Sequence, residues 1–328
     1  MQANTPLPEA LTLDNILVNF ATDEKARKFL ERWLWPEGPT CPRCKSNDKA
    51  TVYKMKGASI RPGLYNCRNC KRAFTATVGT IFEDSHIPLR KWLVAWFLMC
   101  SSKKGVSSLQ MQRMLDLGSY RTALFMTHRI RHALKDTSHA EQLNGVIEMD
   151  ETYVGGRLPP RGTLKKLGRP GPDSHKVPVV SLVQRDGSKR SMVMERITSA
   201  NLKAAVVEHV KEGSKVVSDG YPAYRKIAGA HTHHSVNHSA GEYARKEGDF
   251  TVHTNTVESS FSLLKRGIMG AFHHISKHHL PLYLAEFDFR WNQRKVTDGE
   301  RTVSALKKAS GKRLTYKAIK QSNSEVAR

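Results

Sequence analysis

The sequence predicts a multidomain α+β protein built from successive modules. Four of the five cysteines form two short pairs near the N-terminus, which predicts a small metal-stabilised module. Residues 87–135 show apolar positions at helical spacing, and from residue 145 onward strand-like and helix-like segments alternate. We therefore expect an N-terminal helix and zinc module over 1–86, a helical segment over 87–140, a mixed sheet with flanking helices over 141–300, and a basic tail over 301–328.

The composition narrows the class of partner. The 328 residues include 53 Lys and Arg against 30 Asp and Glu, giving a formal charge of +23. Such a surplus attracts anions, so nucleic acid is the expected partner and an acidic membrane surface the less favoured one. The longest apolar run, Trp92–Cys100, is far shorter than the ~18 residues of a membrane span. The N-terminus lacks the pattern of a signal peptide, so we expect a cytoplasmic protein with reduced cysteines and no membrane partner.

The first module begins with a helix and continues into the cysteine pairs. "TDEKARKFLERWLW" predicts a helix with Thr22 as its N-cap, ended by Pro36. The zinc ligands are expected to be the four cysteines of a C-x2-C, 22-residue, C-x2-C pattern: Cys41, Cys44, Cys67 and Cys70. Two such turns bring four thiolates to one tetrahedral point, as structural Zn²⁺ requires. Unrelated buried thiols and a redox pair are the alternatives, and the two matching turns disfavour both.

Three helices are expected in the second module, over residues 88–102, 107–118 and 119–136. Short helices separated by Gly and Ser are typical of a helix-turn-helix. The last helix carries Arg121, Arg129 and Arg131 beside an apolar face, which makes these three side chains candidates for DNA contact. An ordinary helical hairpin linking two domains is the alternative.

The third module carries two aspartates at or near the ends of strand-like runs. Asp150 follows "GVIEM", and Asp219 follows "KVVS" and precedes Gly220. Side chains at such positions lie at the rim of a sheet, where ligands bind. Two carboxylates that converge there suit Mg²⁺ or Mn²⁺, and a pair of such ions supports phosphodiester chemistry. Taken alone, each Asp is more typical of a turn or cap.

A later helix supplies the remaining candidate groups. Asn255 and Glu258 are three residues apart, and Lys265 follows Glu258 by about two turns, so all three can lie along one stripe. The amide and the acid are candidate metal-side groups, and the lysine is a candidate phosphate contact. A Glu near a helix start also serves the helix dipole, which is the simpler role. Glu148 shares a strand face with Asp150 and is a candidate supporting acid.

A Gly- and Pro-rich insertion over residues 155–176 carries Lys165 and Lys166. Next to an active site, a basic loop of this kind can clamp DNA, and a solvated loop is the equally good alternative.

Three blocks, "MDETYVGGR", "SDGYPAY" and "HTNTVESSFSLLKRG", resemble the catalytic blocks of the IS1595-type (ISXO2-like) insertion-sequence transposases of bacteria. The resemblance implies a zinc ribbon and a helical DNA-binding region ahead of an RNase H-like catalytic domain. It also implies a DDE-type enzyme in which Asp150 and Asp219 are the first two acids. Asn255 matches the Asn that this family often has in third place, and Lys265 matches the Lys that follows. Glu258 is present as well and is favoured by charge, so the third metal ligand stays open between the two.

By the resemblance, the expected function is DNA transposition. The protein would bind the terminal inverted repeats of its element in double-stranded DNA, hydrolyse a phosphodiester with Mg²⁺ or Mn²⁺, and join the freed 3′-hydroxyl to target DNA. Because two ends must be held together, a homo-oligomer is expected, associated with the nucleoid in the bacterial cytoplasm. A metal-dependent nuclease without strand transfer and a non-catalytic DNA-binding regulator are the alternatives.

Overall fold

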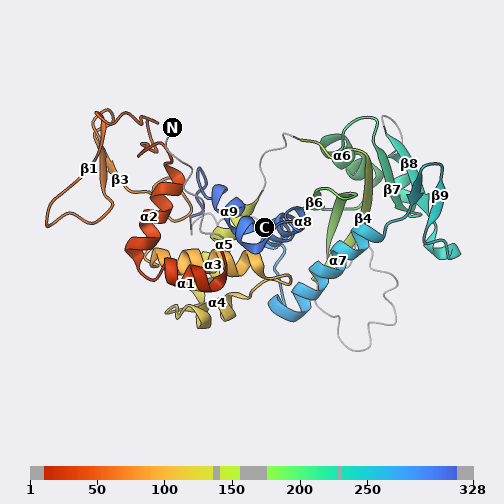
Figure 1. Cartoon of the computed structure of the whole chain (residues 1–328). Helices are drawn as coiled ribbons and strands as arrows, with labels where there is room; N and C mark the ends of the chain where they lie inside the picture. Colours follow the sequence, from red (N-terminus) through yellow and green to blue (C-terminus); the bar gives the residue numbers. More distant parts are fainter. Residues whose placement is uncertain (1–10, 136–140, 156–175, 228–230, 316–328) are drawn as a thin grey trace, which may run out of the picture. The chain divides into compact units, whose positions relative to one another are not determined.

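The computed structural model describes residues 11–135, 141–155, 176–227 and 231–315 (Figure 1). The chain forms two compact units. The first contains residues up to Leu134 together with those from Lys295 onward, and the second runs from Lys135 to Arg294. The zinc module and the helical segment that the sequence predicts therefore lie in the same unit.

Helices make up most of the first unit. Thr22 caps the second helix by accepting a hydrogen bond from the backbone N–H of Lys25 (3.2 Å), as the sequence predicts. The third helix is apolar on most sides and buries Trp92 and Trp96. The helices of this unit are α1 (Leu13–Asn19), α2 (Asp23–Leu34), α3 (Leu89–Ser101), α4 (Ser108–Met114), α5 (Tyr120–Leu134) and α9 (Asp298–Lys307).

Helix α9 replaces the first part of the basic tail that the sequence predicts from residue 301. It begins at a capping box formed by Thr297 and Glu300, packs along α3, and buries Val303 and Leu306. The basic composition of this segment predicts a tail, but its apolar residues, including Val303 and Leu306, form the buried side of a helix. The remaining residues of the predicted tail, from 316 onward, lie outside the described part of the chain.

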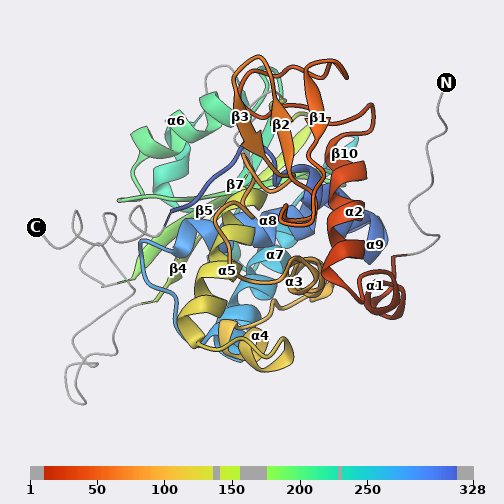
Figure 2. The same cartoon turned by 90° about the vertical axis from the view of Figure 1, so that its left-hand side faces the viewer.

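A small antiparallel sheet carries the zinc module (Figure 2). Strands β1 (Val52–Lys54), β2 (Tyr65–Cys67) and β3 (Arg72–Phe74) pair in that order. Their core is limited to Val52, Tyr65 and Phe74 together with two cysteines, with Trp35 packed edge-on against the aromatic rings. A core of this size is too small to hold a fold without a metal or disulfide.

The second unit contains a mixed five-stranded sheet with the order β6-β5-β4-β7-β8. The strands β4 (Val146–Val154), β5 (Val177–Gln184) and β6 (Lys189–Val193) form an antiparallel meander. The turn between β5 and β6 has the sequence Asp-Gly, and its Asp186 is in the left-handed region (φ 55°). Strands β7 (Lys215–Asp219) and β8 (Thr232–Val236) run parallel to β4. The hairpin of β9 (Arg245–Glu247) and β10 (Phe250–Val252) follows.

Helices cover both faces of this sheet (Figure 1). The side chains of Ile147 and Met149 pack against α6 (Ser199–His209) on one face. Val154 and Val179 pack on the other face against α7 (Asn255–Gly267) and α8 (Leu280–Asn292). Because side chains alternate along a strand, Glu148 and Asp150 point to the same face as Val154, toward α7.

The edge strand β6 is bound to α8 by side chains rather than by another strand. Asn292 accepts a hydrogen bond from the backbone N–H of Lys189 (2.7 Å) and donates one to its carbonyl (3.2 Å). Asp288 accepts from both the N–H and the hydroxyl of Ser191 (2.6 and 2.7 Å). These contacts satisfy backbone N–H and C=O groups of β6 that would otherwise be free to pair with a strand of another chain.

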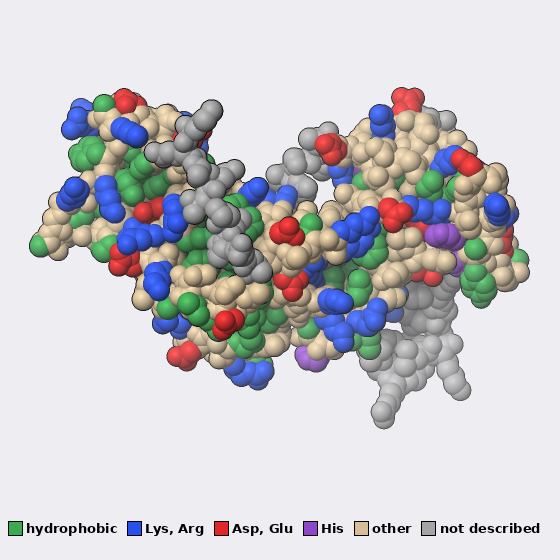
Figure 3. Space-filling model, viewed as in Figure 1, with side chains coloured by type: hydrophobic (Ala, Val, Ile, Leu, Met, Phe, Trp, Pro, Cys, Tyr) green, Lys and Arg blue, Asp and Glu red, His purple; other side chains and the backbone are tan. Residues whose placement is uncertain are grey.

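On the face shown in Figure 3, Lys and Arg side chains are spread over both units rather than gathered in one place. No helix in the described part of the chain is long and apolar enough to cross a membrane.

Candidate active site and metal centre

The four cysteines that the sequence assigns to zinc lie together. Their sulfur atoms are all within 4.8 Å of one another, with 3.6 Å between Cys41 and Cys70 and 3.5 Å between Cys44 and Cys67. Thiolates bound at the usual Zn–S length of about 2.3 Å would be about 3.8 Å apart in a tetrahedron. The set therefore fits a structural Zn²⁺.

Both C-x2-C turns have the same backbone form. The residue after each pair, Lys45 and Lys71, is in the left-handed region (φ 61° and 53°). In the first turn, burial favours the neutral thiol of Cys41, but hydrogen bonds from the backbone N–H groups of Cys44 and Arg43 outweigh it and lower the pKa to about 7. The turn thus favours the thiolate form that zinc binds.

Asp150 and Asp219 are brought to the same level of neighbouring parallel strands. The pairing of β4 with β7 ends with Glu148 opposite Val217, and Asp150 and Asp219 each follow two residues beyond this last pair. Adjacent strands are about 4.8 Å apart. The backbone N–H of Tyr221 binds an oxygen of Asp219 (3.0 Å), and that of Glu151 binds an oxygen of Asp150 (2.8 Å).

The environment of Asp150 disfavours a negative charge. Its pKa is raised to about 8, first by burial and then by the negative charges of Glu151, Asp219 and Glu258, which outweigh the hydrogen bond from the N–H of Glu151. A divalent cation would reverse this balance, because it converts repulsion among carboxylates into shared attraction. The donor set of hard carboxylate oxygens fits Mg²⁺ or Mn²⁺. It is looser than the cysteine set, which among the described residues is the one group whose ligand atoms all lie within 4.8 Å.

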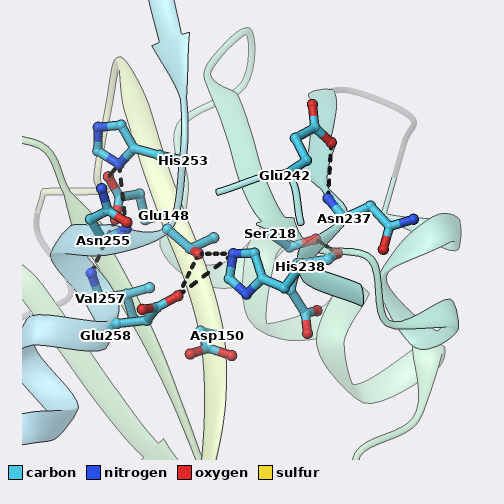
Figure 4. Close-up of polar contacts among 12 residues, drawn as sticks. Glu148, Asp150, Ser218, Asn237, His238, Glu242, His253, Asn255, Val257 and Glu258 are labelled. Carbon is cyan, nitrogen blue, oxygen red and sulfur yellow. Dashed lines mark hydrogen bonds and ion pairs between the residues drawn. The ribbon is translucent and has the colours of Figure 1, made fainter. Parts of the chain in front are cut away.

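Glu258 lies on the first turns of α7 and is directed toward Asp150 and His238 (Figure 4). Its carboxylate accepts a hydrogen bond from the hydroxyl of Thr254 (2.9 Å), and its Oε1 is 3.8 Å from Nε2 of His238. Asn255 is exposed and lies beside His253, whose Nδ1 accepts its backbone N–H (3.3 Å). Of the two candidates for the third ligand, Glu258 is thus the one whose charge acts on Asp150.

Glu148, the candidate supporting acid in the sequence, binds the start of α7. Its fully buried carboxylate accepts hydrogen bonds from the backbone N–H of Thr256 (2.7 Å) and of Val257 (3.0 Å), the first free donors of α7. The hydroxyl of Thr256 donates as well (2.9 Å). Glu148 therefore caps α7 from the neighbouring strand, in place of an N-cap side chain.

Arg185 also binds Glu148, and together the two side chains form a brace between β4 and the start of α7. The sequence alone did not identify Arg185. Its Nε donates to Glu148 (2.8 Å), and its other nitrogens donate to the carbonyls of Thr251 (2.5 Å) and His253 (3.1 Å). The segment that leads into α7 is thereby tied to β4. The available signal was local, an Arg next to the Asp-Gly turn, but its partners lie 37 to 68 residues away.

A second buried contact flanks the aspartates from the other face of the sheet. The hydroxyl of Tyr224, fully buried in η1 (Pro222–Lys226), donates to the carboxylate of Glu151. Burial and then the charge of Glu151 raise the pKa of Tyr224 well above its usual value, so the phenol stays protonated and remains a donor. Sequence reasoning missed this pair also.

The other predicted residues are placed as follows. Lys265 is exposed on α7, and Arg121 is exposed at the start of α5. Arg129 and Arg131 are buried, with 4% and 0% of their surface exposed, which argues against the prediction that they contact DNA. Arg129 donates to the carbonyl of Glu83 and lies over the ring of Trp92, so the polar side of α5 faces the interior of the unit. Lys165 and Lys166 lie outside the described residues.

Comparison with known proteins decides the family. Residues 142–292 match the model of the ISXO2-like transposase domain, and residues 21–73 match that of the transposase zinc-ribbon domain. A protein of Halobacterium salinarum, described as an uncharacterized protein in transposable element ISH50, is 30% identical over an alignment of 288 residues that covers 83% of this chain and 91% of that protein. The chain belongs to the ISXO2-like (IS1595) transposase family. The resemblance found in the sequence is therefore confirmed.

Both matched regions contain the sites described above. The zinc-ribbon match of this ISXO2-like transposase spans all four clustered cysteines, which supports structural zinc. The match to the transposase domain spans Asp150, Asp219 and the whole of α7, and it ends at the last residue of α8.

Proposed function

We propose that this ISXO2-like transposase is a DDE-type enzyme that hydrolyses a phosphodiester at the ends of its element and joins the freed 3′-hydroxyl to target DNA. The observation that supports the proposal is that Asp150 and Asp219 each lie two residues beyond the last pair of the parallel strands β4 and β7, and that the charge of Asp219 acts on Asp150. The strand order, an antiparallel meander extended by two parallel strands with helices on both faces, supports an RNase H-like catalytic domain.

Asp150, Asp219 and Glu258 are the residues that would hold Mg²⁺ or Mn²⁺. When bound, the cations supply Lewis-acid chemistry, which activates the attacking oxygen and stabilises the leaving one. Burial, and after it the negative charges of Glu151, Asp219 and Glu258, raise the pKa of Asp150, which supports a cation-binding role for this carboxylate cluster. The brace of Glu148 and Arg185 positions α7, and with it Glu258, relative to β4.

Glu258 is our choice for the third ligand, and Asn255 and Lys265 are assigned to the DNA. Glu258 adds the charge that offsets divalent ions. Asn255 is exposed one turn earlier on α7, where its amide can bind a phosphate or sugar oxygen beside the reacting bond. Lys265, exposed two turns further along, is suited to a backbone phosphate.

DNA binding is proposed for the first unit as well. The zinc ribbon and the exposed start of α5, with Arg121, are candidates for contact with double-stranded DNA of the element ends. Joining two ends in one reaction calls for at least two copies of the chain, so we propose a homo-oligomer in the synaptic complex, acting at the nucleoid.

Incubation of the protein with radiolabelled element ends and a plasmid target in Mg²⁺ or Mn²⁺ tests the proposal. The wild type is expected to cut the ends and to join pre-cut ends to the plasmid. Asp150→Asn, Asp219→Asn and Glu258→Gln are expected to abolish both steps, whereas Asn255→Ala is expected to retain measurable cleavage. Cutting without joining would indicate a nuclease, and binding without any metal-dependent product would indicate a regulator.

A further inference from the structure

An exposed aromatic pair lies next to the third carboxylate. The ring of Tyr243 packs against His238, with 5.4 Å between ring centroids and an angle of 32°, yet 65% of Tyr243 is exposed. Nε2 of His238 is 3.4 Å from Oγ1 of Thr254 and 3.8 Å from Oε1 of Glu258. The hydroxyl of Thr254 has one proton, which it donates to Glu258, so His238 is the donor to Thr254. The aromatic pair is thus connected to the carboxylate by two hydrogen bonds in sequence.

The turn that carries this pair is held in one shape. Asn237 and Glu242 bind each other twice, through the N–H of Glu242 to the carbonyl of Asn237 (3.1 Å) and through the N–H of Asn237 to the carboxylate of Glu242 (3.0 Å) (Figure 4). Gly241 takes the left-handed conformation (φ 78°) that closes η2 (His238–Ala240). Arg245 joins the turn to β8 by donating to the carbonyl of Ser235 (3.2 Å). A ring presented on so constrained a turn loses little freedom when it binds a flat partner.

Because the proposed substrate is DNA, the expected flat partner of the Tyr243 ring is a nucleobase. A DNA-cutting site must reach a phosphate in a duplex whose bases are stacked, and a base next to the reacting phosphate becomes accessible when it leaves the stack. Exposed aromatic rings bind such bases by stacking, whatever their sequence. We propose that Tyr243, supported by His238, is a stacking site for one unpaired nucleobase of the DNA end, next to the carboxylates. This inference rests on the proposed function for its substrate class.

The test measures binding, so it does not depend on cleavage. The full-length protein, with its structural zinc retained, is titrated without added Mg²⁺ or Mn²⁺ with three fluorescent DNAs: a fully paired duplex, the same duplex with a short oligothymidine flank, and a duplex whose flank lacks bases. The wild type is expected to bind the oligothymidine flank more tightly than the abasic one. Tyr243→Ala is expected to weaken binding of the oligothymidine flank by about 5- to 150-fold, the range of one stacked base, and to leave the other two DNAs unchanged.

Two variants make the result specific. Tyr243→Phe keeps the ring and is expected to bind like the wild type. Val207→Ala truncates a comparably exposed apolar side chain (58%) on α6, which covers the opposite face of the sheet, and is expected to have no effect. Equal losses for the Phe and Ala variants would indicate a contact of the hydroxyl and would overturn the stacking site, as would an Ala variant indistinguishable from the wild type. Either outcome can occur while Asp150→Asn still abolishes cleavage, so the inference and the proposed function fail separately.

Discussion

Replacing Glu148 by Gln should loosen the start of α7. The carboxylate is fully buried, pairs with Arg185, and accepts the backbone N–H groups of Thr256 and Val257. Gln has nearly the same shape but carries no charge and presents an NH₂ group in place of one acceptor oxygen. At least one of the donors that converge on Glu148 must therefore lose its partner, and Arg185 is left with an uncompensated charge.

The magnitude follows from these contacts. Removing one partner of a buried ion pair costs about 3–5 kcal/mol. The hydrogen bonds to the charged oxygen are each worth about 1.5–3 kcal/mol, but they belong to the same group and do not add. We therefore expect a loss of about 3–5 kcal/mol in the stability of the α7 start, which corresponds to an increase in amide exchange rate of about two to three and a half powers of ten.

Hydrogen exchange of the full-length protein, read at the amides of Thr256 and Val257, measures this loss. Glu208→Gln serves as the matched control, because that carboxylate is 60% exposed on α6, and its replacement should change stability by less than about 0.5 kcal/mol. An increase of less than tenfold for Glu148→Gln would refute the assignment of Glu148 as the cap of α7.

Three further predictions concern charge, zinc and DNA. The pKa of Asp150 is raised to about 8 from an ordinary 3.8, so the second unit without a bound divalent cation should lose stability as pH rises from about 4 to 8. Asp150→Asn should be more stable than the wild type by about 5 kcal/mol at pH 8 and nearly equal to it near pH 4, measured by urea unfolding without added Mg²⁺ or Mn²⁺. Cys67→Ala should lower the zinc content from one ion per chain to none by elemental analysis and remove amide protection over residues 52–74, while β4 and β5 keep theirs. Arg121→Ala should reduce the slope of log affinity for DNA against log salt concentration by about 1 without loss of stability, and an unchanged slope would contradict this. Arg129→Ala should lower the free energy of unfolding by about 1–3 kcal/mol, and an unchanged free energy of unfolding would contradict this.

Features that depend on local spacing could be predicted from the sequence. The zinc set follows from two C-x2-C turns, because each turn alone brings two sulfurs together. The alternation of strands and helices in the second unit likewise follows from the periodicity of apolar residues. Asp150 and Asp219 could be singled out because each follows an apolar run, although the parallel register that aligns them needed the structure.

Features that depend on distant partners could not be predicted. Glu148 is a candidate supporting acid in the sequence because it shares a strand face with Asp150, but the backbone donors that it binds lie 108 and 109 residues away. Arg129 and Arg131 resemble the basic face of a recognition helix, yet that face is buried, and the partner of Arg129 is a carbonyl 46 residues earlier. Amphipathic spacing identifies a polar face but does not tell whether solvent, DNA or protein covers it.

We propose that Asp150, Asp219 and Glu258 jointly bind the divalent cation of the active site. Anomalous X-ray scattering from crystals grown with Mn²⁺ tests it most directly. We expect manganese peaks within bonding distance of carboxylate oxygens of both aspartates, with Glu258 as a further ligand and Asn255 outside the ligand shell. Manganese bound elsewhere, or bound to Asp150 and Asn255 without Glu258, would contradict it.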